Sequence, residues 1–304
     1  MKSATITIRC PAKINLGLSV LGRRPDGYHE IRSILQSVSL HDTLEVQRAR
    51  RFSLQIEEEW AAVSRGGGVP ADGGNLVLKA AAALKSSLGE RAAAFRLIKR
   101  IPPGAGMGGA SSDAAAAVVA LDRLYDLGLK PPEFHRIAAS IGSDVPFFLY
   151  GGACLALGRG EEIYPLPDGP SLQLVVVFSA KGLSTPEVYS RWDRLLTSTD
   201  KASRMNDFAP WCLVLRGEDP AIANDLETAA IALEASLGEV RSALTGAGAK
   251  AVSMTGSGSA FFGIFSDAKA AEHGASRLRR AGHAAVNAVS LGRAEWMEAV
   301  RAVG

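Results

Sequence analysis

A glycine-rich segment near the middle of the chain has the composition of a phosphate-binding loop. The stretch Pro102–Ser112 reads PPGAGMGGASS and contains four glycines. Glycine tolerates positive φ angles and close approach to a ligand, so successive amide N–H groups can point into one concavity. The segment leads into a predicted helix, Ala110–Tyr125, whose free N–H groups and positive dipole end favour phosphate. The alternative is a glycine-rich turn whose serines only cap the helix, and the density of glycines favours phosphate binding.

Two familiar nucleotide-binding motifs do not account for this segment. Gly104, Gly106 and Gly109 match the spacing G-x-G-x-x-G, but that motif also requires an acidic residue ~20 positions later, at the end of a strand. The corresponding region, Gly128–Pro132, is predicted to be a loop between helices. A Walker P-loop needs a Gly-Lys-Ser/Thr triplet, which the chain lacks.

The composition fits a globular protein without a strong electrostatic preference. The chain has 304 residues, 47% of them hydrophobic, and a net charge of +3. This charge gives little reason to expect a nucleic-acid partner. The short basic runs Arg48–Arg51 and Arg277–Arg280 are interpreted as solvated faces. The length predicts two domains.

Cysteine, histidine and the N-terminus point to a cytoplasmic protein without a structural metal site. The three cysteines, Cys10, Cys154 and Cys212, are widely spaced, which argues against disulfides. Cys10 and Cys154 lie in apolar runs and are expected to be buried. The five histidines show no metal-ligand spacing. No signal peptide and no run of ~18 apolar residues is found, so no membrane partner is expected.

Hydrophobic periodicity predicts strands and helices that mix without regular alternation, which indicates an α+β fold. The predicted strands are Ile6–Cys10, Leu16–Val20, Asp42–Val46, Phe52–Ile56, Phe95–Ile98, Leu172–Phe178, Ala251–Met254, Ala260–Phe265 and Ala284–Val289. Besides Ala110–Tyr125, the predicted helices are Asn75–Ser87, one beginning at Pro131, Pro186–Leu196, Asp225–Leu237, Gly238–Leu244 and Ala268–Ala281. The glycine- and proline-rich stretch Gly158–Pro170 predicts a boundary between domains 1–164 and 165–304.

Three separated segments resemble the three motifs of the GHMP kinases (galactose, homoserine, mevalonate and phosphomevalonate kinases). They are Pro11–Leu16 (PAKINL), Pro102–Ala115 and Thr255–Ala260 (TGSGSA), and they occur in the family's order. The resemblance implies two domains, each a mixed or antiparallel sheet packed with helices. The N-terminal domain would bind ATP, the C-terminal domain would contribute to the substrate site, and the active site would lie in the cleft between them.

Further segments are similar to one branch of this family, whose acceptor carries a cytidine diphosphate group. They are Arg24–Glu30, Gly142–Phe148, Thr185–Tyr189 and Asn224–Glu227. The implied reaction is transfer of the ATP γ-phosphoryl group to a 2-hydroxyl in non-mevalonate isoprenoid biosynthesis. Two features depart from the pattern: Ser143 stands where alanine is common, and Glu57–Asp72 looks inserted.

The resemblance implies that Asp144 accepts the hydroxyl proton and that Lys13 lies beside it. Phosphoryl transfer depends mainly on charge neutralisation and alignment. An opposite charge within ~4–6 Å would keep both groups ionised. The alternatives are a solvated lysine at a strand end and an aspartate that caps a helix.

On the acceptor side, the resemblance implies that Tyr28 and His29 recognise the cytosine and that Tyr189 stacks on its other face. Tyr189 could equally be a surface aromatic at the domain interface. Asn15 and Thr185 would contact polar groups of the substrate or be buried hydrogen-bonding residues. Gly256 and Ser257 would lie near the substrate diphosphate.

On the nucleotide side, the resemblance places ATP on the glycine loop, with magnesium bridging the two polyanions. The loop residues implied are Pro103, Gly104, Ala105, Gly106, Met107, Gly108, Gly109, Ala110, Ser111 and Ser112. Ser112 is the candidate magnesium ligand. Asn75 and Lys99 would lie near the adenine, or be a helix cap and a solvated lysine. A monomer or weak homodimer is expected.

Two other functions stay open at this stage. One is a GHMP kinase acting on homoserine or a mevalonate derivative, but neither acceptor has a base for Tyr28, His29 and Tyr189 to stack on. The other is a catalytically silent ATP-binding regulator, which the retention of both Lys13 and Asp144 disfavours.

Overall fold

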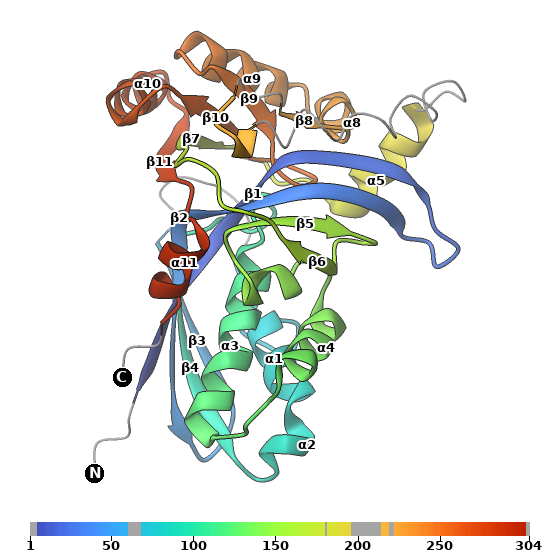
Figure 1. Ribbon diagram of the computed structural model, residues 1–304, viewed down its shortest axis with the longest axis vertical. Helices are drawn as coiled ribbons and strands as arrows, with labels where there is room; N and C mark the ends of the chain where they lie inside the picture. The colour runs from blue at the N-terminus through green and yellow to red at the C-terminus, as the bar shows by residue number, and fades with distance from the viewer. Residues whose placement is uncertain (1–4, 60–67, 180, 196–213, 219–221, 302–304) are drawn as a thin grey trace.

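Two β-sheets with helices packed against them make up the part of the chain that the computed structural model describes, which is residues 5–59, 68–179, 181–195, 214–218 and 222–301 (Figure 1). One sheet comes mainly from the first half of the chain and the other from the second half. This mixed architecture confirms the predicted α+β class.

The larger sheet has the order β3-β4-β2-β1-β8, and β5 pairs with β2 and with β6. Its strands are β1 (Ile6–Arg23), β2 (His29–Ala49), β3 (Ser53–Glu58), β4 (Ala92–Lys99), β5 (Ala153–Leu157), β6 (Glu162–Pro165) and β8 (Ala223–Asn224). The pairs β3–β4 and β1–β8 are parallel and the others antiparallel. The helical elements that follow or interrupt these strands are α1 (Leu76–Ala83), α2 (Lys85–Leu88), α3 (Gly109–Tyr125), α4 (Pro131–Ile141) and the 3₁₀ turn η2 (Pro146–Leu149).

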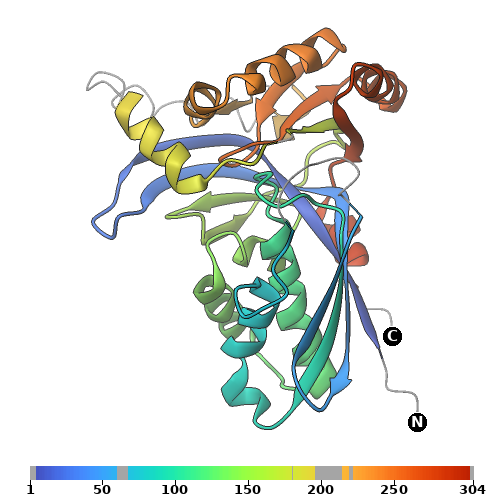
Figure 2. The ribbon, with the colours of Figure 1, turned by 180° about the vertical axis from the view of Figure 1, so that it is seen from behind.

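The smaller sheet is antiparallel, with the order β11-β7-β10-β9. Its strands are β7 (Gln173–Phe178), β9 (Ala251–Met254), β10 (Phe261–Phe265) and β11 (Ala284–Val289). The helices of this half are α5 (Thr185–Leu195), α8 (Glu227–Leu233), α9 (Ser236–Gly246) and α10 (Ala268–Arg280) (Figure 2). Helix α11 (Arg293–Ala299) returns to contact β1. Because β8 and α11 lie against the first half, the division at residue 164 stays a prediction.

Strand β1 runs through three hydrophobic clusters and so ties the two halves together. Cys10 packs between the larger sheet and helices α1 and α3. Ala12, Ile14 and Leu16 pack between the two sheets, and Leu18 and Val20 pack with residues of the smaller sheet and its helices. Side chains alternate along a strand, so Lys13 and Asn15 face away from the apolar residues between which they lie. This alternation directs both polar side chains toward the glycine loop.

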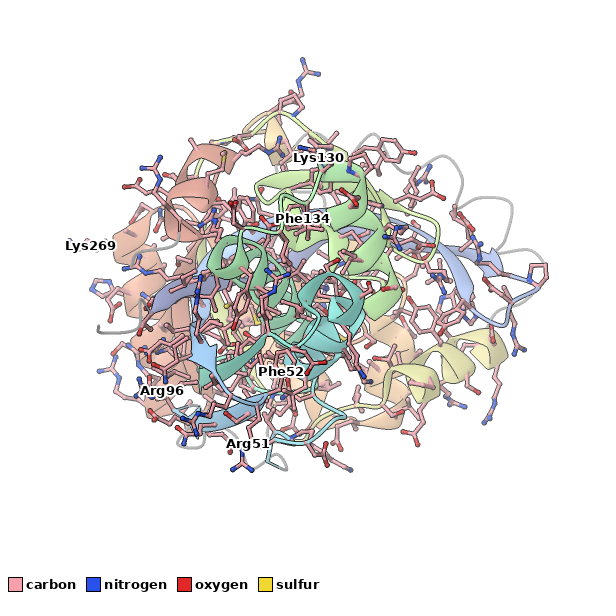
Figure 3. The ribbon with its side chains drawn as sticks, turned by 90° about the horizontal axis from the view of Figure 1, so that it is seen from below. Arg51, Phe52, Arg96, Lys130, Phe134 and Lys269 are labelled. Carbon is pink, nitrogen blue, oxygen red and sulfur yellow. The ribbon has the colours of Figure 1, made fainter. Side chains whose placement is uncertain are left out.

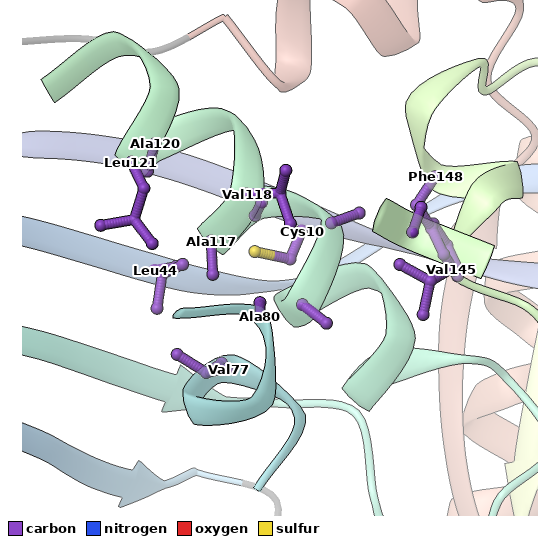
Figure 4. Close-up of a cluster of buried hydrophobic side chains, with 14 of the residues drawn as sticks. Cys10, Leu44, Val77, Ala80, Ala117, Val118, Ala120, Leu121, Val145 and Phe148 are labelled. Carbon is purple, nitrogen blue, oxygen red and sulfur yellow. The ribbon is translucent and has the colours of Figure 1, made fainter. Parts of the chain in front are cut away.

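Cys10 lies in the cluster between the larger sheet and helices α1 and α3, with Leu44, Val77 and Ala117 nearby (Figure 4). Cys10 and Cys154 are buried free thiols, as predicted. Burial raises the pKa of the Cys10 thiol, so this cysteine acts as a small core residue. Cys212 lies outside the described residues.

Arg51, Arg96 and Lys130 lie on the face that is seen from below, together with Phe52 and Phe134 (Figure 3). Arg50 and Arg51 are exposed, as are the three arginines of the run at the end of α10, which confirms that both basic runs are solvated. Arg96 pairs with Glu45 and Glu57 on neighbouring strands. In the described residues, no helix is long and apolar enough to cross a membrane.

The first two strands are longer than predicted. The two predicted strands Ile6–Cys10 and Leu16–Val20 are parts of one strand, which passes through Pro11 at a register shift where the missing N–H is tolerated. Strand β2 begins at His29, not at Asp42, because both faces of its first half are covered and the two-residue pattern is lost. Strands β5, β6 and β8 and helix α11 are not among the predicted elements.

Candidate active site

The glycine loop bends into helix α3 through glycines that other residues could not replace. Gly104, Gly106 and Gly108 have φ angles of +69°, +74° and +70°. Gly108 is the N-cap of α3, and a Cβ there would lie 2.8 Å from the Phe148 ring. The first backbone N–H groups of the 17-residue helix α3 therefore lie at the concave side of the glycine loop. This geometry confirms the predicted loop and helix start.

The second glycine segment packs backbone against backbone on the first. The Ser259 N–H donates to the Gly104 carbonyl at 3.1 Å, and the Ala260 N–H donates to the Ala105 carbonyl at 3.2 Å. A Cβ on Gly106 would lie 2.1 Å from the Thr255 carbonyl oxygen. Gly106 therefore has a structural role: it lets two segments that are distant in sequence touch.

Strand β1 joins both glycine segments through Lys13 and Asn15. The Lys13 backbone N–H donates to the Met107 carbonyl at 3.0 Å. The Asn15 side-chain oxygen accepts from Lys13 Nζ at 2.8 Å, from the Gly256 N–H at 2.8 Å and from Thr255 Oγ1 at 3.1 Å. The Asn15 amide nitrogen donates to Ser33 Oγ at 2.8 Å. These contacts favour the buried hydrogen-bonding role for Asn15 over a substrate contact.

Lys13 and Asp144 form an ion pair at the wall of a cavity. Lys13 Nζ lies 3.7 Å from Asp144 Oδ2, and the side chains are 3% and 40% exposed. The solvated-lysine interpretation of Lys13 is therefore wrong. Burial lowers the pKa of Lys13, and the attraction of Asp144 offsets part of this shift. Val145, not Asp144, is the N-cap of η2, so Asp144 is left to face the cavity.

Two cavities meet over the glycine loop. The larger, about 720 Å³, is lined by Lys13, Asn15, Tyr28, His29, Asp144, Thr185, Tyr189, Gly256 and Ser257 among others. The smaller, about 420 Å³, is lined by Asn75, Lys99 and the loop residues Pro103–Ser111. Gly106, Gly108, Ser111 and Thr185 line both. Two ligands could therefore lie end to end, with their meeting point at the loop.

An aromatic cluster lies in the larger cavity, away from the loop. The rings of His29 and Tyr189 are stacked with centroids 4.7 Å apart. Tyr28 is 55% exposed, and the Arg159 guanidinium lies 4.8 Å from its ring centroid. The predicted sandwich between Tyr28 and Tyr189 is therefore not preformed, because Tyr189 packs on His29.

Lys99 is buried in an ion-pair cluster beneath the loop. Its Nζ donates to Asp113 Oδ2 at 2.7 Å and to Asp42 Oδ2. Asp42 Oδ1 also accepts from the Ile101 N–H at 2.8 Å. Burial alone would lower the pKa of Lys99, but the attraction of Asp113 and Asp42 outweighs it and the pKa is raised. The solvated-lysine interpretation of Lys99 is wrong, although Lys99 does line the smaller cavity.

Asn75, the second residue predicted near the adenine, is the N-cap of α1. Its Oδ1 accepts from the Val77 N–H at 2.9 Å, so the capping role is confirmed. Asn75 also lines the smaller cavity, which keeps the nucleotide contact as a prediction.

The two serines at the start of α3 face different places. Ser111 lines both cavities. Ser112 is buried and lines a separate hollow with Arg9 and Trp296. Consecutive helical residues point about 100° apart, so only one of the two can face the loop's concave side. The position of Ser112 argues against the prediction that it ligates magnesium.

Three residues that sequence reasoning missed also line the larger cavity: Arg23, Arg159 and Asp193. Arg159 stands between Gly158 and Gly160, which have φ angles of +70° and +110°. Besides belonging to the predicted domain boundary, these glycines turn the chain beside Asp144, since a Cβ on Gly160 would lie 3.8 Å from Asp144 Oδ1. Thr185 Oγ1 and Ser257 Oγ lie 2.7 Å apart and join α5 to the second glycine segment.

Comparison with known proteins agrees with this arrangement. The model of the GHMP kinases N terminal domain matches residues 75–152, and that of the GHMP kinases C terminal domain matches residues 215–284. A 4-diphosphocytidyl-2-C-methyl-D-erythritol kinase of Pelotomaculum thermopropionicum is 40% identical over 90% of this chain and 94% of its own length. The enzyme of the same name from Nocardia farcinica is 39% identical over 91% and 90%.

Solved structures of kinases share the fold of this chain. A crystal structure of a 4-(cytidine 5'-diphospho)-2C-methyl-D-erythritol kinase is 36% identical and superposes with a TM-score of 0.78, covering 94% of this chain and 99% of the other. A homoserine kinase from Cytophaga hutchinsonii, 17% identical, has a TM-score of 0.76 over 100% and 98% of the two chains and shows the shared fold alone. From the fold, the three joined motifs and these relatives, the chain belongs to the GHMP kinase family.

Proposed function

We propose that this chain transfers the γ-phosphoryl group of ATP to the 2-hydroxyl of 4-diphosphocytidyl-2-C-methyl-D-erythritol. The observation that carries the proposal is the pair of adjoining cavities, which share the glycine loop and have Lys13 and Asp144 on the acceptor side. The relatives that are about 40% identical over most of the chain bear the name of this activity.

The nucleotide occupies the smaller cavity, with its phosphates against the glycine loop and the first turn of α3. Backbone amides and the helix dipole stabilise the phosphate charge there. Asn75 and Lys99 also line this cavity, and in the proposal they lie near the adenine. Because Lys99 is already paired with two carboxylates, its contribution is to hold the floor of the cavity in place.

The acceptor occupies the larger cavity, with its hydroxyl between Lys13 and Asp144. The hydroxyl oxygen bonds to the γ-phosphorus as the bond from that phosphorus to the β-phosphate oxygen breaks, and ADP leaves. Asp144 accepts the hydroxyl proton, and the Lys13 ammonium stabilises the negative charge of the transferring group. Asn15 fixes the position of Lys13 Nζ through its 2.8 Å hydrogen bond.

The far end of the acceptor holds the cytidine diphosphate group. A cavity of about 720 Å³ is in the usual range for a ligand of this size. His29, Tyr28 and Tyr189 offer ring faces and edges to the cytosine, and Arg23 and Arg159 offer positive charge to the diphosphate. Ser257 and the Gly256 backbone lie on the same wall.

Magnesium is part of the proposal. When bound with ATP, it neutralises charge on the β- and γ-phosphates. Ser111 and Asp144 are among the oxygen donors that line the larger cavity, and in the described residues no group of three or more acidic, histidine or cysteine side chains could hold a metal. The site therefore fits an ion held mostly by phosphate oxygens and water.

A coupled assay of ADP release with the purified chain tests the function. We expect turnover with the cytidyl acceptor, none with homoserine or mevalonate, and competitive inhibition by CMP. Turnover with homoserine or mevalonate would show that the chain is another GHMP kinase. Absence of turnover with every acceptor, despite ATP binding, would favour the silent regulator.

A further inference from the structure

One face of helix α5 holds the His29 side chain on three sides. Tyr189, Trp192 and Asp193 are spaced i, i+3 and i+4, so they project from the same face. Tyr189 stacks on the imidazole, and the Trp192 ring meets it edge-on with centroids 5.8 Å apart. Asp193 Oδ1 lies 2.9 Å from His29 Nε2. The orientation of the imidazole is therefore fixed by α5 and not by the hairpin that carries it.

The contact with Asp193 also decides which ring nitrogen carries the hydrogen. A carboxylate only accepts hydrogen bonds, so His29 Nε2 must donate. In a neutral imidazole the other nitrogen, Nδ1, is then an acceptor. Nδ1 makes no hydrogen bond within the described part of the chain, and His29 lines the acceptor cavity together with Asp193.

We infer that Asp193 is a positioning residue that holds His29 as the Nε2–H tautomer, so that Nδ1 presents an acceptor to the exocyclic amino group of a pyrimidine base. Cytosine has an amino group at C4, which can donate to Nδ1. Uracil has a carbonyl oxygen there, which is also an acceptor and so forms no hydrogen bond with Nδ1. Asp193 thus selects cytidine over uridine nucleotides without touching the base. This inference rests on the proposed function, since it concerns the base of the proposed acceptor.

The structural part can be tested without turnover. In protein labelled with ¹⁵N at histidine and held at about pH 8, we expect His29 to show a protonated Nε2 and an unprotonated Nδ1. Comparison with His29→Gln assigns the signal among the five histidines. In Asp193→Ala, the two tautomers should become mixed. A wild-type His29 with the proton on Nδ1 would overturn the inference.

The selective part can be tested by calorimetric binding of CMP and UMP. We expect the wild type to bind CMP more tightly than UMP. In Asp193→Asn the ratio of the two dissociation constants should fall roughly ten-fold, because the amide can donate to Nε2 and permit the other tautomer. In turnover, KM for the cytidyl acceptor should rise while kcat and KM for ATP stay unchanged. Asp193→Glu should restore part of the preference.

The matched control is Glu187→Gln, which removes the same charge from an exposed position on α5 and should leave both nucleotides unaffected. Unchanged discrimination in Asp193→Asn would overturn the role of Asp193 and leave the proposed function standing. Failure of the wild type to bind CMP would overturn both.

Discussion

Two buried lysines beside the glycine loop differ in how completely they are paired. Lys99 lies between two buried carboxylates, and its pKa is raised. Lys13 has one carboxylate partner at 3.7 Å, which is itself half-exposed, and its pKa is lowered by burial. A fully paired lysine has little left to offer a ligand, whereas an incompletely paired one beside a cavity gains when an anion arrives. The difference supports the proposal that Lys99 holds the loop in place and that Lys13 takes part in the transfer.

The largest expected effect is on the stability of Lys99→Met. This change leaves Asp42 and Asp113 buried without their cation, and we expect a loss of about 3–5 kcal/mol in the free energy of unfolding. Urea denaturation measures it. Lys79→Met, at an exposed position on α1, is the control and should change stability by less than about 0.5 kcal/mol. A loss below about 1 kcal/mol for Lys99→Met would remove the distinction between the two lysines.

The next effect is on the activity of Asp144→Asn. An amide cannot accept the hydroxyl proton, so kcat should fall at least ~100-fold. Stability should fall by no more than about 1 kcal/mol, because the half-exposed Asp144 offsets only part of the burial cost of Lys13. Steady-state kinetics and urea denaturation on the same preparation check both. Asp126→Asn, at the C-terminal cap of α3, should keep full kcat. A kcat for Asp144→Asn within ten-fold of the wild type would contradict the proposed base.

The pH dependence of kcat/KM sharpens the role of Lys13. Lysine is charged below its pKa, and burial lowers the pKa of Lys13 from its usual 10.5. Activity should therefore fall as the pH rises through a value below 10.5, where the ammonium loses its proton. Lys13→Arg keeps its charge at alkaline pH and should lose this limb of the profile, even if its maximal rate is lower. An identical limb in both proteins would show that another group titrates.

The smallest effect is expected for Asp113→Asn. Burial and the nearby Asp42 raise the pKa of the Asp113 carboxyl although Lys99 opposes them. The folded state thus binds this proton more tightly than the unfolded state, so the wild type loses stability as the pH rises above 3.8. Asp113→Asn removes that loss and keeps a hydrogen-bond acceptor for Lys99. The free energy of unfolding of Asp113→Asn should lie within about 1 kcal/mol of the wild-type value at about pH 5. At about pH 8 the variant should be more stable relative to the wild type than it is at about pH 5.

Urea denaturation at the two pH values measures this effect, and Asp42→Asn provides the contrast. Asp42 also accepts two backbone N–H groups, from Arg100 and Ile101, so its replacement should cost more at both pH values. Equal losses of unfolding free energy in the two variants would mean that Asp42 and Asp113 contribute equally to stability.

The sequence predicted the parts of the site that depend on local patterns. The glycine loop and the start of α3 follow from residues with fixed backbone requirements, whereas the resemblance to the GHMP kinases implies the pairing of Lys13 with Asp144. The cap at Asn75 was predictable from the preference of asparagine for the N-terminal cap of a helix.

Other features depend on contacts between distant segments and could not be predicted. The pairing of Lys99 could not be predicted because its partner Asp42 lies on a different strand, 57 residues earlier. The choice between Ser111 and Ser112 depends on the rotation of α3 about its axis, which packing sets. The full length of β1 and β2 was hidden because residues covered on both faces lose their alternation. Asp193 had no sequence signal, because its role depends on contact with His29, which lies 164 residues earlier in the chain.

The most direct test of the account is Lys13→Met, measured for both kcat and the free energy of unfolding alongside Lys99→Met. Methionine fills a similar volume, and removing a charge that burial disfavours should leave Lys13→Met as stable as the wild type or more so. We predict that Lys13→Met is folded with kcat reduced at least ~100-fold, and that Lys99→Met is less stable but retains most of its kcat per folded molecule. Active Lys13→Met, or folded Lys99→Met with kcat reduced as strongly, would contradict the account.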